Sequence, residues 1–155
     1  MQADIGIPQV QTKKLVDVLH RLLADEHIIL TKTRNYHWNI RGSSFMELHK
    51  FYESQYELLT NLIDEIAERV TQLGDTAIGT MKEFLETTRL EEGPYHHQQD
   101  QQIKRLLEDH QTLCKHLRED IDQSDKYDDP VTTDFLTGVL AQHEKMAWML
   151  RSFLK

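Results

Sequence analysis

The sequence is poor in the residues that cross-link or interrupt a chain. It contains one cysteine, three prolines and six glycines among 155 residues. The single thiol of Cys114 excludes an internal disulfide and a metal site built from several thiolates. Its place in an apolar row with Leu113 and Leu117 predicts a packed small hydrophobe. Because Pro and Gly are the strongest helix breakers, their scarcity favours long helices.

Long apolar runs are also missing. No stretch approaches the roughly 20 apolar residues that cross a membrane. Residues 1–7 lack the basic and apolar blocks of a signal peptide. We therefore expect a cytoplasmic protein without a membrane span, folded as one domain over residues 1–155 with a substantial core.

Positive charge is in deficit. The 18 Lys and Arg residues face 26 Asp and Glu residues, which gives a formal net charge of −8. DNA binding depends on Lys and Arg contacts to phosphates, and the first ten residues contain neither. Direct binding to DNA is therefore not expected, whereas an acidic protein suits a cation as its partner.

Apolar residues are present in four long segments, at the i, i+3, i+4, i+7 spacing of amphipathic helices. The segments are Leu15–Ile29, Leu48–Leu73, Ile103–Ile121 and Phe135–Leu154. No segment alternates in the manner of a strand. The pattern predicts an all-α fold with four long helices.

Helix-breaking and helix-capping residues stand between these segments. Breaks are expected at 41–43, after Gly74, at 92–95 and at 128–130. Two capping boxes are expected, Ser44 with Glu47 at the start of the second long helix and Thr80 with Glu83 at the start of a short helix ending near Thr88. A long connection carrying a short helix, between the second and third long helices, is typical of a ferritin-like four-helix bundle.

The second long helix carries side chains suited to binding a metal ion. His49 and Glu53 are four residues apart, as are Asp64 and Glu68, and all four fall on one stripe about 100° wide. His37 lies near the end of the preceding helix. Two imidazoles and three carboxylates suit Fe²⁺, Mn²⁺ or Zn²⁺.

Helix geometry places these ligands too far apart for one ion. Glu53 and Asp64 are separated by about 16 Å at a rise of about 1.5 Å per residue, whereas metal–ligand bonds are about 2 Å long. Either the chain carries two half-sites, or a second copy completes the site across a twofold axis near Leu58 and Leu59. The alternative is a solvated acidic face, with His37 packed among aromatic neighbours.

Several runs of the sequence resemble the Dps family of miniferritins over nearly the whole chain. The matching residues are Tyr36–Gly42, Phe45, Leu48–His49, Glu53, Asp64–Arg69, Lys82–Leu85, Asp134 and Trp148. The resemblance implies a shell of twelve subunits that binds Fe²⁺ at twofold interfaces. It also implies that the shell oxidises Fe²⁺, preferably with hydrogen peroxide, and stores ferric mineral, which protects the cell and its DNA from oxidative damage.

The resemblance also divides the ligands between subunits. His37, His49 and Glu53 come from one subunit, and Asp64 and Glu68 from the other. Glu68 is expected to be the strongest ligand. Asp64 and His37 complete the tighter position, and His49 and Glu53 form a weaker second one, so that each site takes one or two irons. Many members have Asp where this chain has Glu53.

Other residues are candidates with a wider choice of roles. Trp38, next to His37, is either a radical trap or simple interface packing. Asp125, Asp129 and Asp134 match an acidic pore of the family, although Asp129 is also a helix-capping candidate. The remaining histidines are expected to face solvent or an interface: His20, His27, His96, His97, His110, His116 and His143.

Two other functions compete with the iron store. One is a DNA-compacting shell whose iron chemistry is secondary, which the missing basic tail disfavours. The other is a dinuclear carboxylate oxidase acting on an organic substrate. Bundles with a metal site inside one subunit use Glu-x-x-His motifs, and this chain contains none, so the site between subunits has no obvious rival within the bundle.

Overall fold

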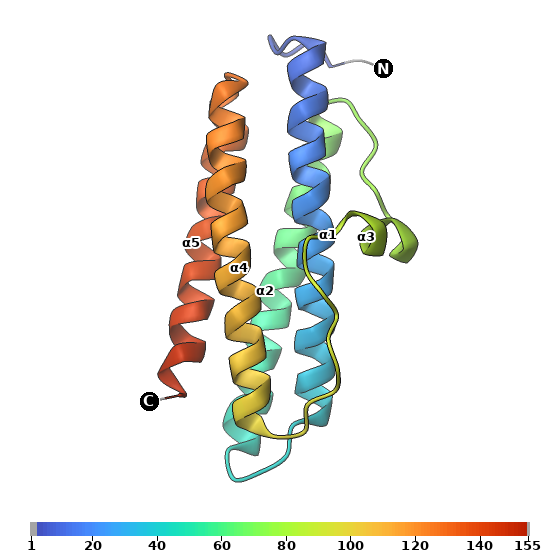
Figure 1. The fold of residues 1–155 in the computed structure, drawn as a ribbon. Helices are drawn as coiled ribbons and strands as arrows, with labels where there is room; N and C mark the ends of the chain where they lie inside the picture. The colour runs from blue at the N-terminus through green and yellow to red at the C-terminus, as the bar shows by residue number, and fades with distance from the viewer. Residues whose placement is uncertain (1–2, 155) are drawn as a thin grey trace.

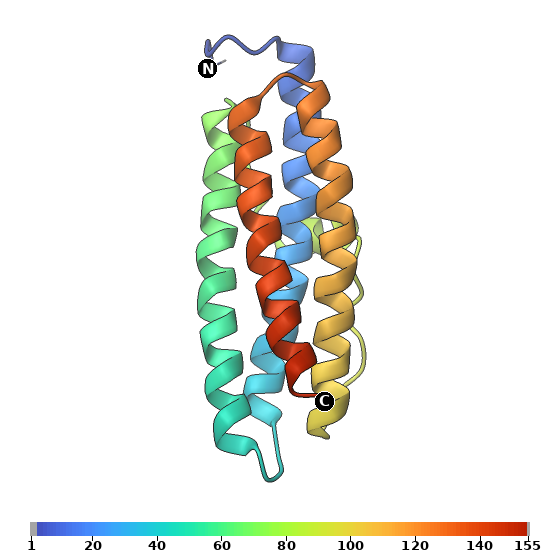
Figure 2. The ribbon, with the colours of Figure 1, turned by 90° about the vertical axis from the view of Figure 1, so that its left-hand side faces the viewer.

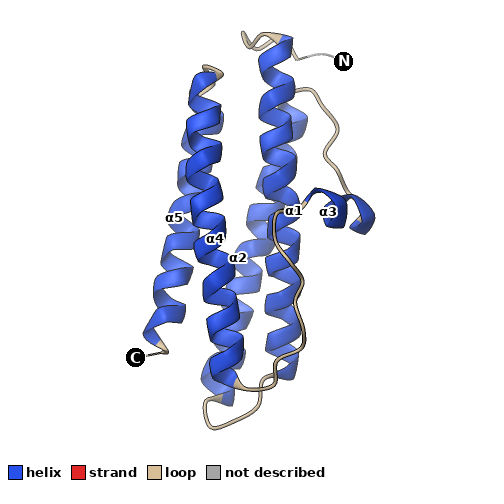
Figure 3. Ribbon diagram, viewed as in Figure 1, coloured by secondary structure: helices blue, strands red, loops and turns tan. Residues whose placement is uncertain are grey.

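Four long helices lie side by side in the structure, a computed structural model that describes residues 3–154. They are α1 (Gln9–Asn39), α2 (Phe45–Gln72), α4 (Gln99–Lys126) and α5 (Pro130–Ser152). The short α3 (Met81–Thr87) lies outside the bundle, against α1 (Figure 1). The described residues contain helices but no strand (Figure 3), and none of these helices is long and apolar enough to cross a membrane. The predicted all-α class is confirmed.

The connections give the ferritin-like topology. Short turns join α1 to α2 and α4 to α5, so that each pair is antiparallel (Figure 2). The connection 73–98 runs the length of the bundle beside α1 and carries α3 on its way (Figure 1). Gly42 turns the chain between α1 and α2 with a φ of 122°, a conformation that glycine adopts readily.

The two predicted capping boxes had different outcomes. At α3, the backbone N–H of Glu83 donates to Thr80 Oγ1 at 3.3 Å, and Glu83 Oε2 accepts from the Thr80 N–H at 2.9 Å. The box predicted at Ser44 and Glu47 is wrong, because the Ser44 side chain makes no capping hydrogen bond. With φ −96° and ψ 25°, Ser44 departs from the extended backbone that N-cap residues usually adopt.

The predicted apolar stripes form two buried clusters along the bundle. The larger contains Leu19, Leu59, Ile66, Leu113, Leu117 and Val139 among others. The smaller contains Tyr36, Leu48, Tyr52, Ile103, Leu106 and Leu150 among others. Full burial of one such Leu stabilises the fold by about 1.5–3 kcal/mol. Cys114 packs half-buried against the larger cluster as predicted, and burial raises the pKa of its thiol to about 11.

A row of polar side chains crosses the core. Glu26 Oε1 accepts from His143 Nε2 at 2.7 Å, and His143 Nδ1 lies 2.9 Å from His110 Nδ1. All three side chains are fully buried. The prediction that His110 and His143 face solvent or an interface is therefore wrong: both lie on the faces of α4 and α5 that meet α1.

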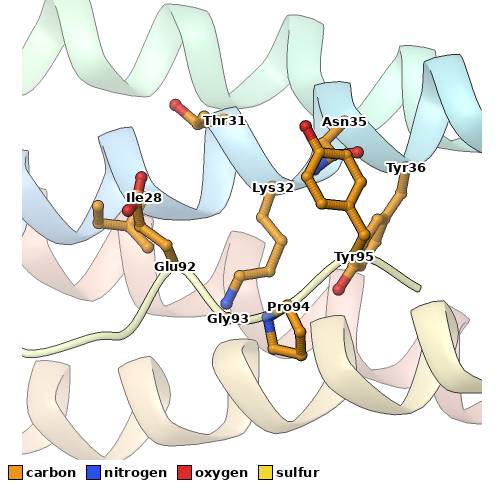
Figure 4. Close-up of a pocket in the computed structure, with 9 residues that line it drawn as sticks. All are labelled: Ile28, Thr31, Lys32, Asn35, Tyr36, Glu92, Gly93, Pro94 and Tyr95. Atoms are coloured by element: carbon orange, nitrogen blue, oxygen red, sulfur yellow. The ribbon is translucent and has the colours of Figure 1, made fainter.

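Buried ion pairs hold the long connection onto the bundle. The Arg89 guanidinium pairs with Asp25 at 2.8 Å and with Asp120 at 2.9 Å. Lys32 Nζ lies 2.6 Å from Asp109 and donates to the carbonyl of Glu91. Beside Lys32, the segment 92–95 passes over α1 and leaves a cavity of about 250 Å³ (Figure 4). None of the predicted metal ligands lines this cavity.

Candidate metal centre

The turn between α1 and α2 brings His37 and His49 face to face. His37 lies in the last turn of α1 and His49 early in α2. Their rings stack with centroids 3.8 Å apart and planes inclined by 17°. His37 Nδ1 lies 2.8 Å from the carbonyl oxygen of His49, and His49 Nδ1 lies 2.9 Å from the carbonyl oxygen of His37. Each histidine is thus oriented by the backbone of the other.

This reciprocal pairing fixes which ring nitrogen can bind a metal. A carbonyl oxygen only accepts hydrogen bonds, so Nδ1 carries the proton in both rings. In neutral imidazoles the lone pair is then on Nε2. Metal-binding histidines are commonly oriented in this way, by a hydrogen bond from the other ring nitrogen to a carbonyl or carboxylate. His37 and His49 are therefore prepared as nitrogen ligands.

Glu53 lies one helical turn beyond His49 and is half-buried. The Tyr56 hydroxyl donates a long hydrogen bond of 3.4 Å to Glu53 Oε1. The Tyr56 ring meets the His37 ring edge-on, with centroids 5.2 Å apart, and the Arg34 guanidinium lies 5.3 Å from the Tyr56 ring centroid. Desolvation, followed by the nearby carboxylates Glu53 and Glu57, raises the pKa of Tyr56.

Asp64 and Glu68 are exposed further along α2. Within residues 3–154, no group of three or more His, Cys, Asp or Glu side chains is arranged to hold a metal ion. One chain therefore presents its histidines with Glu53 in one place, and Asp64 with Glu68 in another. The single subunit does not bring the five predicted ligands together.

The described aromatic neighbours of His37 lie on α2. Trp38 is 71% exposed, and the described aromatic contacts of His37 are with His49 and Tyr56. Sequence reasoning missed Tyr56. The available signal was its spacing: it follows Glu53 by three residues and His49 by seven, which places all three on one face of α2.

The three candidate pore residues lie in different surroundings. Asp125 and Asp134 are exposed, whereas Asp129 is buried. Asp129 caps α5 by accepting from the N–H groups of Val131 and Thr132, and its Oδ2 lies 2.8 Å from an Arg69 nitrogen. The structure therefore shows the capping role that the sequence also allowed, and Asp129 does not present its carboxylate to a pore.

Hydrogen bonds explain why the carboxylate of Asp129 is charged. Burial alone would raise the pKa of Asp129. The hydrogen bonds from Thr132 and the Arg69 guanidinium outweigh burial, so the pKa lies below its ordinary value. The charged carboxylate thus completes the start of α5 and neutralises the buried end of Arg69.

Comparison with known proteins gives a consistent picture. The family model of the ferritin-like domain matches residues 16–155. A low-temperature-induced protein of Nostoc sp. is 41% identical over 158 residues, covering 98% of this chain and 86% of the relative. DNA protection during starvation protein 2 of Bacillus anthracis is 34% identical over 142 residues, covering 92% and 97%. The crystal structure of the Dps protein from Vibrio cholerae O1 superposes with a TM-score of 0.94 at 29% identity, covering 99% and 97%. The chain therefore belongs to the Dps group of the ferritin-like proteins.

Proposed function

We propose that this protein is a ferroxidase and iron store. It binds Fe²⁺ at sites shared between two subunits, oxidises it, preferably with hydrogen peroxide, and keeps the ferric product inside a shell of twelve copies. Family membership supports iron chemistry, since the Vibrio cholerae relative is described as a member of the ferritin-like diiron-carboxylate proteins. Consuming Fe²⁺ and peroxide together removes the two reactants that generate hydroxyl radical, which protects DNA and other targets.

The reciprocal pairing of His37 and His49 is the observation that carries this proposal. Each ring donates from Nδ1 to the other residue's carbonyl, which leaves both Nε2 atoms as ligands for a borderline cation such as Fe²⁺. His37 is buried and His49 is half-buried, and each ring keeps its Nε2 free of the contacts that orient it.

A second copy of the chain supplies the missing carboxylates. Glu53 and Asp64 lie about 16 Å apart along α2, and no metal-binding group forms within the described part of one chain. An antiparallel pairing of two α2 helices about an axis near Leu58 and Leu59 sets the histidines of one subunit against Asp64 and Glu68 of the partner subunit. A twofold axis makes two equivalent sites.

Two irons per site would supply the two electrons that the reaction needs. Reduction of hydrogen peroxide to water takes two electrons, and each Fe²⁺ gives one. With two irons, 2 Fe²⁺ + H₂O₂ + 2 H⁺ gives 2 Fe³⁺ + 2 H₂O. In this proposal Glu68 of the partner subunit is the strongest ligand, with His37 and Asp64 of the partner subunit at the tighter position. His49 and Glu53 serve a weaker second position.

Exposed acidic residues favour cation entry. Asp125 and Asp134 lie near the α4–α5 turn with their side chains in solvent. We place them in a pore between subunits, where rings of carboxylates raise the local concentration of cations. Asp129 is left out of this pore because its carboxylate is held by Arg69.

The decisive experiment is anaerobic loading with Fe²⁺, addition of peroxide, and sizing of the assembly. Wild-type protein is expected to oxidise iron rapidly as a large homo-oligomer, and His37→Ala and Asp64→Ala are each expected to abolish the fast phase. Asp100→Asn, which removes an exposed carboxylate at the start of α4 outside the ligands and the pore, serves as a control that keeps full oxidation. A monomer without fast oxidation rules out the proposal.

Mixed assemblies test where the ligands come from. When His37→Ala and Asp64→Ala subunits are unfolded and reassembled together in equal amounts, a mixed pair contains one fully native site and one doubly defective site. About a quarter of all sites then regain activity. If the site lies within one subunit, the mixture stays as inactive as its two parents.

A further inference from the structure

Tyr56 is the one aromatic side chain, among those the structure describes, that contacts both kinds of proposed ligand. Its hydroxyl donates to the Glu53 carboxylate and its ring edge meets the His37 imidazole. Tyr56 is half-buried and packs at the margin of the larger apolar cluster. The ring therefore joins the metal half-site to a carboxylate that can take up a proton.

We propose that Tyr56 supplies the second electron when only one iron occupies the site. The inference rests on the proposed ferroxidase function and adds a residue to it. A single Fe²⁺ gives one electron, and one-electron reduction of peroxide releases hydroxyl radical. An electron from Tyr56 completes the reduction to water and leaves a phenoxyl radical held within the protein.

The step balances in atoms and charge. Fe²⁺ + Tyr56–OH + H₂O₂ + H⁺ gives Fe³⁺ + Tyr56–O• + 2 H₂O. Oxidation makes the phenol strongly acidic, so its proton must leave together with the electron. The Glu53 carboxylate, already the acceptor of the Tyr56 hydrogen bond, takes that proton and passes it to the water being formed. A later Fe²⁺ and a proton restore the phenol.

The long hydrogen bond is compatible with this role. At 3.4 Å the contact is longer than an ordinary O–H···O bond, and hydrogen bonds of catalytic groups commonly tighten when the reactants bind. Glu53 is one methylene longer than the Asp found in many relatives of this type. Its carboxylate therefore has the reach to meet both an iron and the Tyr56 hydroxyl from one position on α2.

Among the described residues, Tyr36, Tyr52 and Trp38 make neither of the two contacts. Tyr36 and Tyr52 are buried, and their hydroxyls have no hydrogen-bond partner within residues 3–154. A buried phenol without a base cannot release its proton on oxidation. Trp38 is adjacent to His37 in sequence, but it is 71% exposed in the single subunit and is not among the described aromatic contacts of His37.

Freeze-quench electron paramagnetic resonance tests the inference directly. The assembled protein is loaded with one Fe²⁺ per site without oxygen, mixed with peroxide and frozen. Wild-type protein is expected to show an organic radical whose hyperfine pattern changes when ring-deuterated tyrosine is incorporated. Tyr56→Phe keeps the ring against His37 but lacks the hydroxyl, so the signal is lost and spin-trapped hydroxyl radical increases.

Control variants separate Tyr56 from the other aromatic residues. Tyr95→Phe alters an exposed ring on the long connection, away from the proposed ligands, and is expected to keep the full signal. Trp38→Phe is also expected to keep it. Zn²⁺ binding and thermal unfolding of Tyr56→Phe, compared with wild type, establish that its ligands and fold are intact.

The outcomes distinguish this inference from the function on which it rests. If wild-type protein oxidises iron but shows no tyrosine radical, or if Trp38→Phe rather than Tyr56→Phe removes the signal, the role of Tyr56 is refuted and the ferroxidase function stands. If wild-type protein does not oxidise Fe²⁺ with peroxide at any loading, both fail together.

Discussion

At the scale of single residues, His110 links burial to pH. Burial, and then the charges of His143 and Lys32, hold the pKa of His110 well below its ordinary value. In the unfolded chain a histidine takes up a proton near pH 6.5, whereas folded His110 stays neutral. Its contribution to stability is therefore complete above pH 6.5 and is lost as the pH falls below that value, by about 1.4 kcal/mol per unit.

Replacing His110 should flatten the dependence of stability on pH. His110→Gln removes the titrating group, so its unfolding free energy is expected to fall less steeply than that of wild type between pH 7 and pH 5. Burial raises the pKa of Asp109 and Asp120, which acts in the opposite direction, and the comparison of the two proteins cancels that effect. Denaturant unfolding at several pH values measures both slopes.

An exposed histidine provides the matched control for this prediction. His97 lies in solvent on the loop before α4. His97→Gln makes the same substitution outside the core and serves as the reference for any effect of replacing a histidine by glutamine at the surface. Parallel profiles for wild type and His110→Gln would contradict the assignment of His110 as a buried neutral group.

Local spacing in the sequence identified candidate residues that share one face of a helix. It missed pairs whose two members come from different helices. His49, Glu53, Asp64 and Glu68 were recognisable because their spacing on α2 is helical. The pairing of Glu26 with His143 was not, since these residues are 117 positions apart. Only the assembly of the four-helix bundle, in which α1 and α5 both pack against α4, brings them together across the core, and no local pattern records it.

The orientation of the two histidine rings could not be predicted from the sequence, for a different reason. The partners of His37 and His49 are backbone carbonyls, and every residue carries a carbonyl. Nothing in the residue types marks which carbonyls a ring will meet.

At the scale of whole elements, the long connection depends on Arg89. The guanidinium pairs with two fully buried carboxylates, Asp25 and Asp120. Arg89→Ala leaves both without their main cation. We expect the unfolding free energy to fall by about 3–5 kcal/mol, the usual cost of breaking a buried pair from one side. Thermal or denaturant unfolding measures the loss.

A surface ion pair gives the control for Arg89. Arg118 pairs with Glu144 between α4 and α5, and both side chains are largely exposed. Arg118→Ala is expected to cost no more than about 1 kcal/mol, since water screens exposed pairs. Equal losses for the two variants would show that the connection is not held by Arg89.

The sequence predicted which elements exist better than how they are anchored. Apolar periodicity located all four long helices, and the capping box located α3. The path of residues 73–98 along α1 depends on Arg89, which pairs with buried acids on α1 and α4, and on Lys32 of α1, which donates to the carbonyl of Glu91. In the sequence alone, such charges are indistinguishable from ordinary surface residues.

At the scale of the whole molecule, net charge sets the choice of partner. The chain carries a formal charge of −8, and we expect the proposed shell, which multiplies that charge, to repel DNA. No retardation of duplex DNA is expected in a gel-shift assay at low salt and neutral pH. A variant with a Lys-rich extension added before Met1 is the positive control and should retard DNA in a salt-dependent manner. Tight retardation by the unmodified protein would favour the DNA-compacting alternative.

The reciprocal hydrogen bonding of His37 and His49 determines when during assembly iron oxidation can begin. It forms within one α1–α2 hairpin, so a newly folded subunit already has its nitrogen ligands in place before it meets another copy. In the proposed site Glu53 is already beside the histidines, and Asp64 and Glu68 of the partner subunit arrive only when subunits pair. If the proposed function is correct, a free subunit is fully folded but catalytically inactive. Oxidation of iron therefore begins only as subunits assemble into the shell that stores the ferric product.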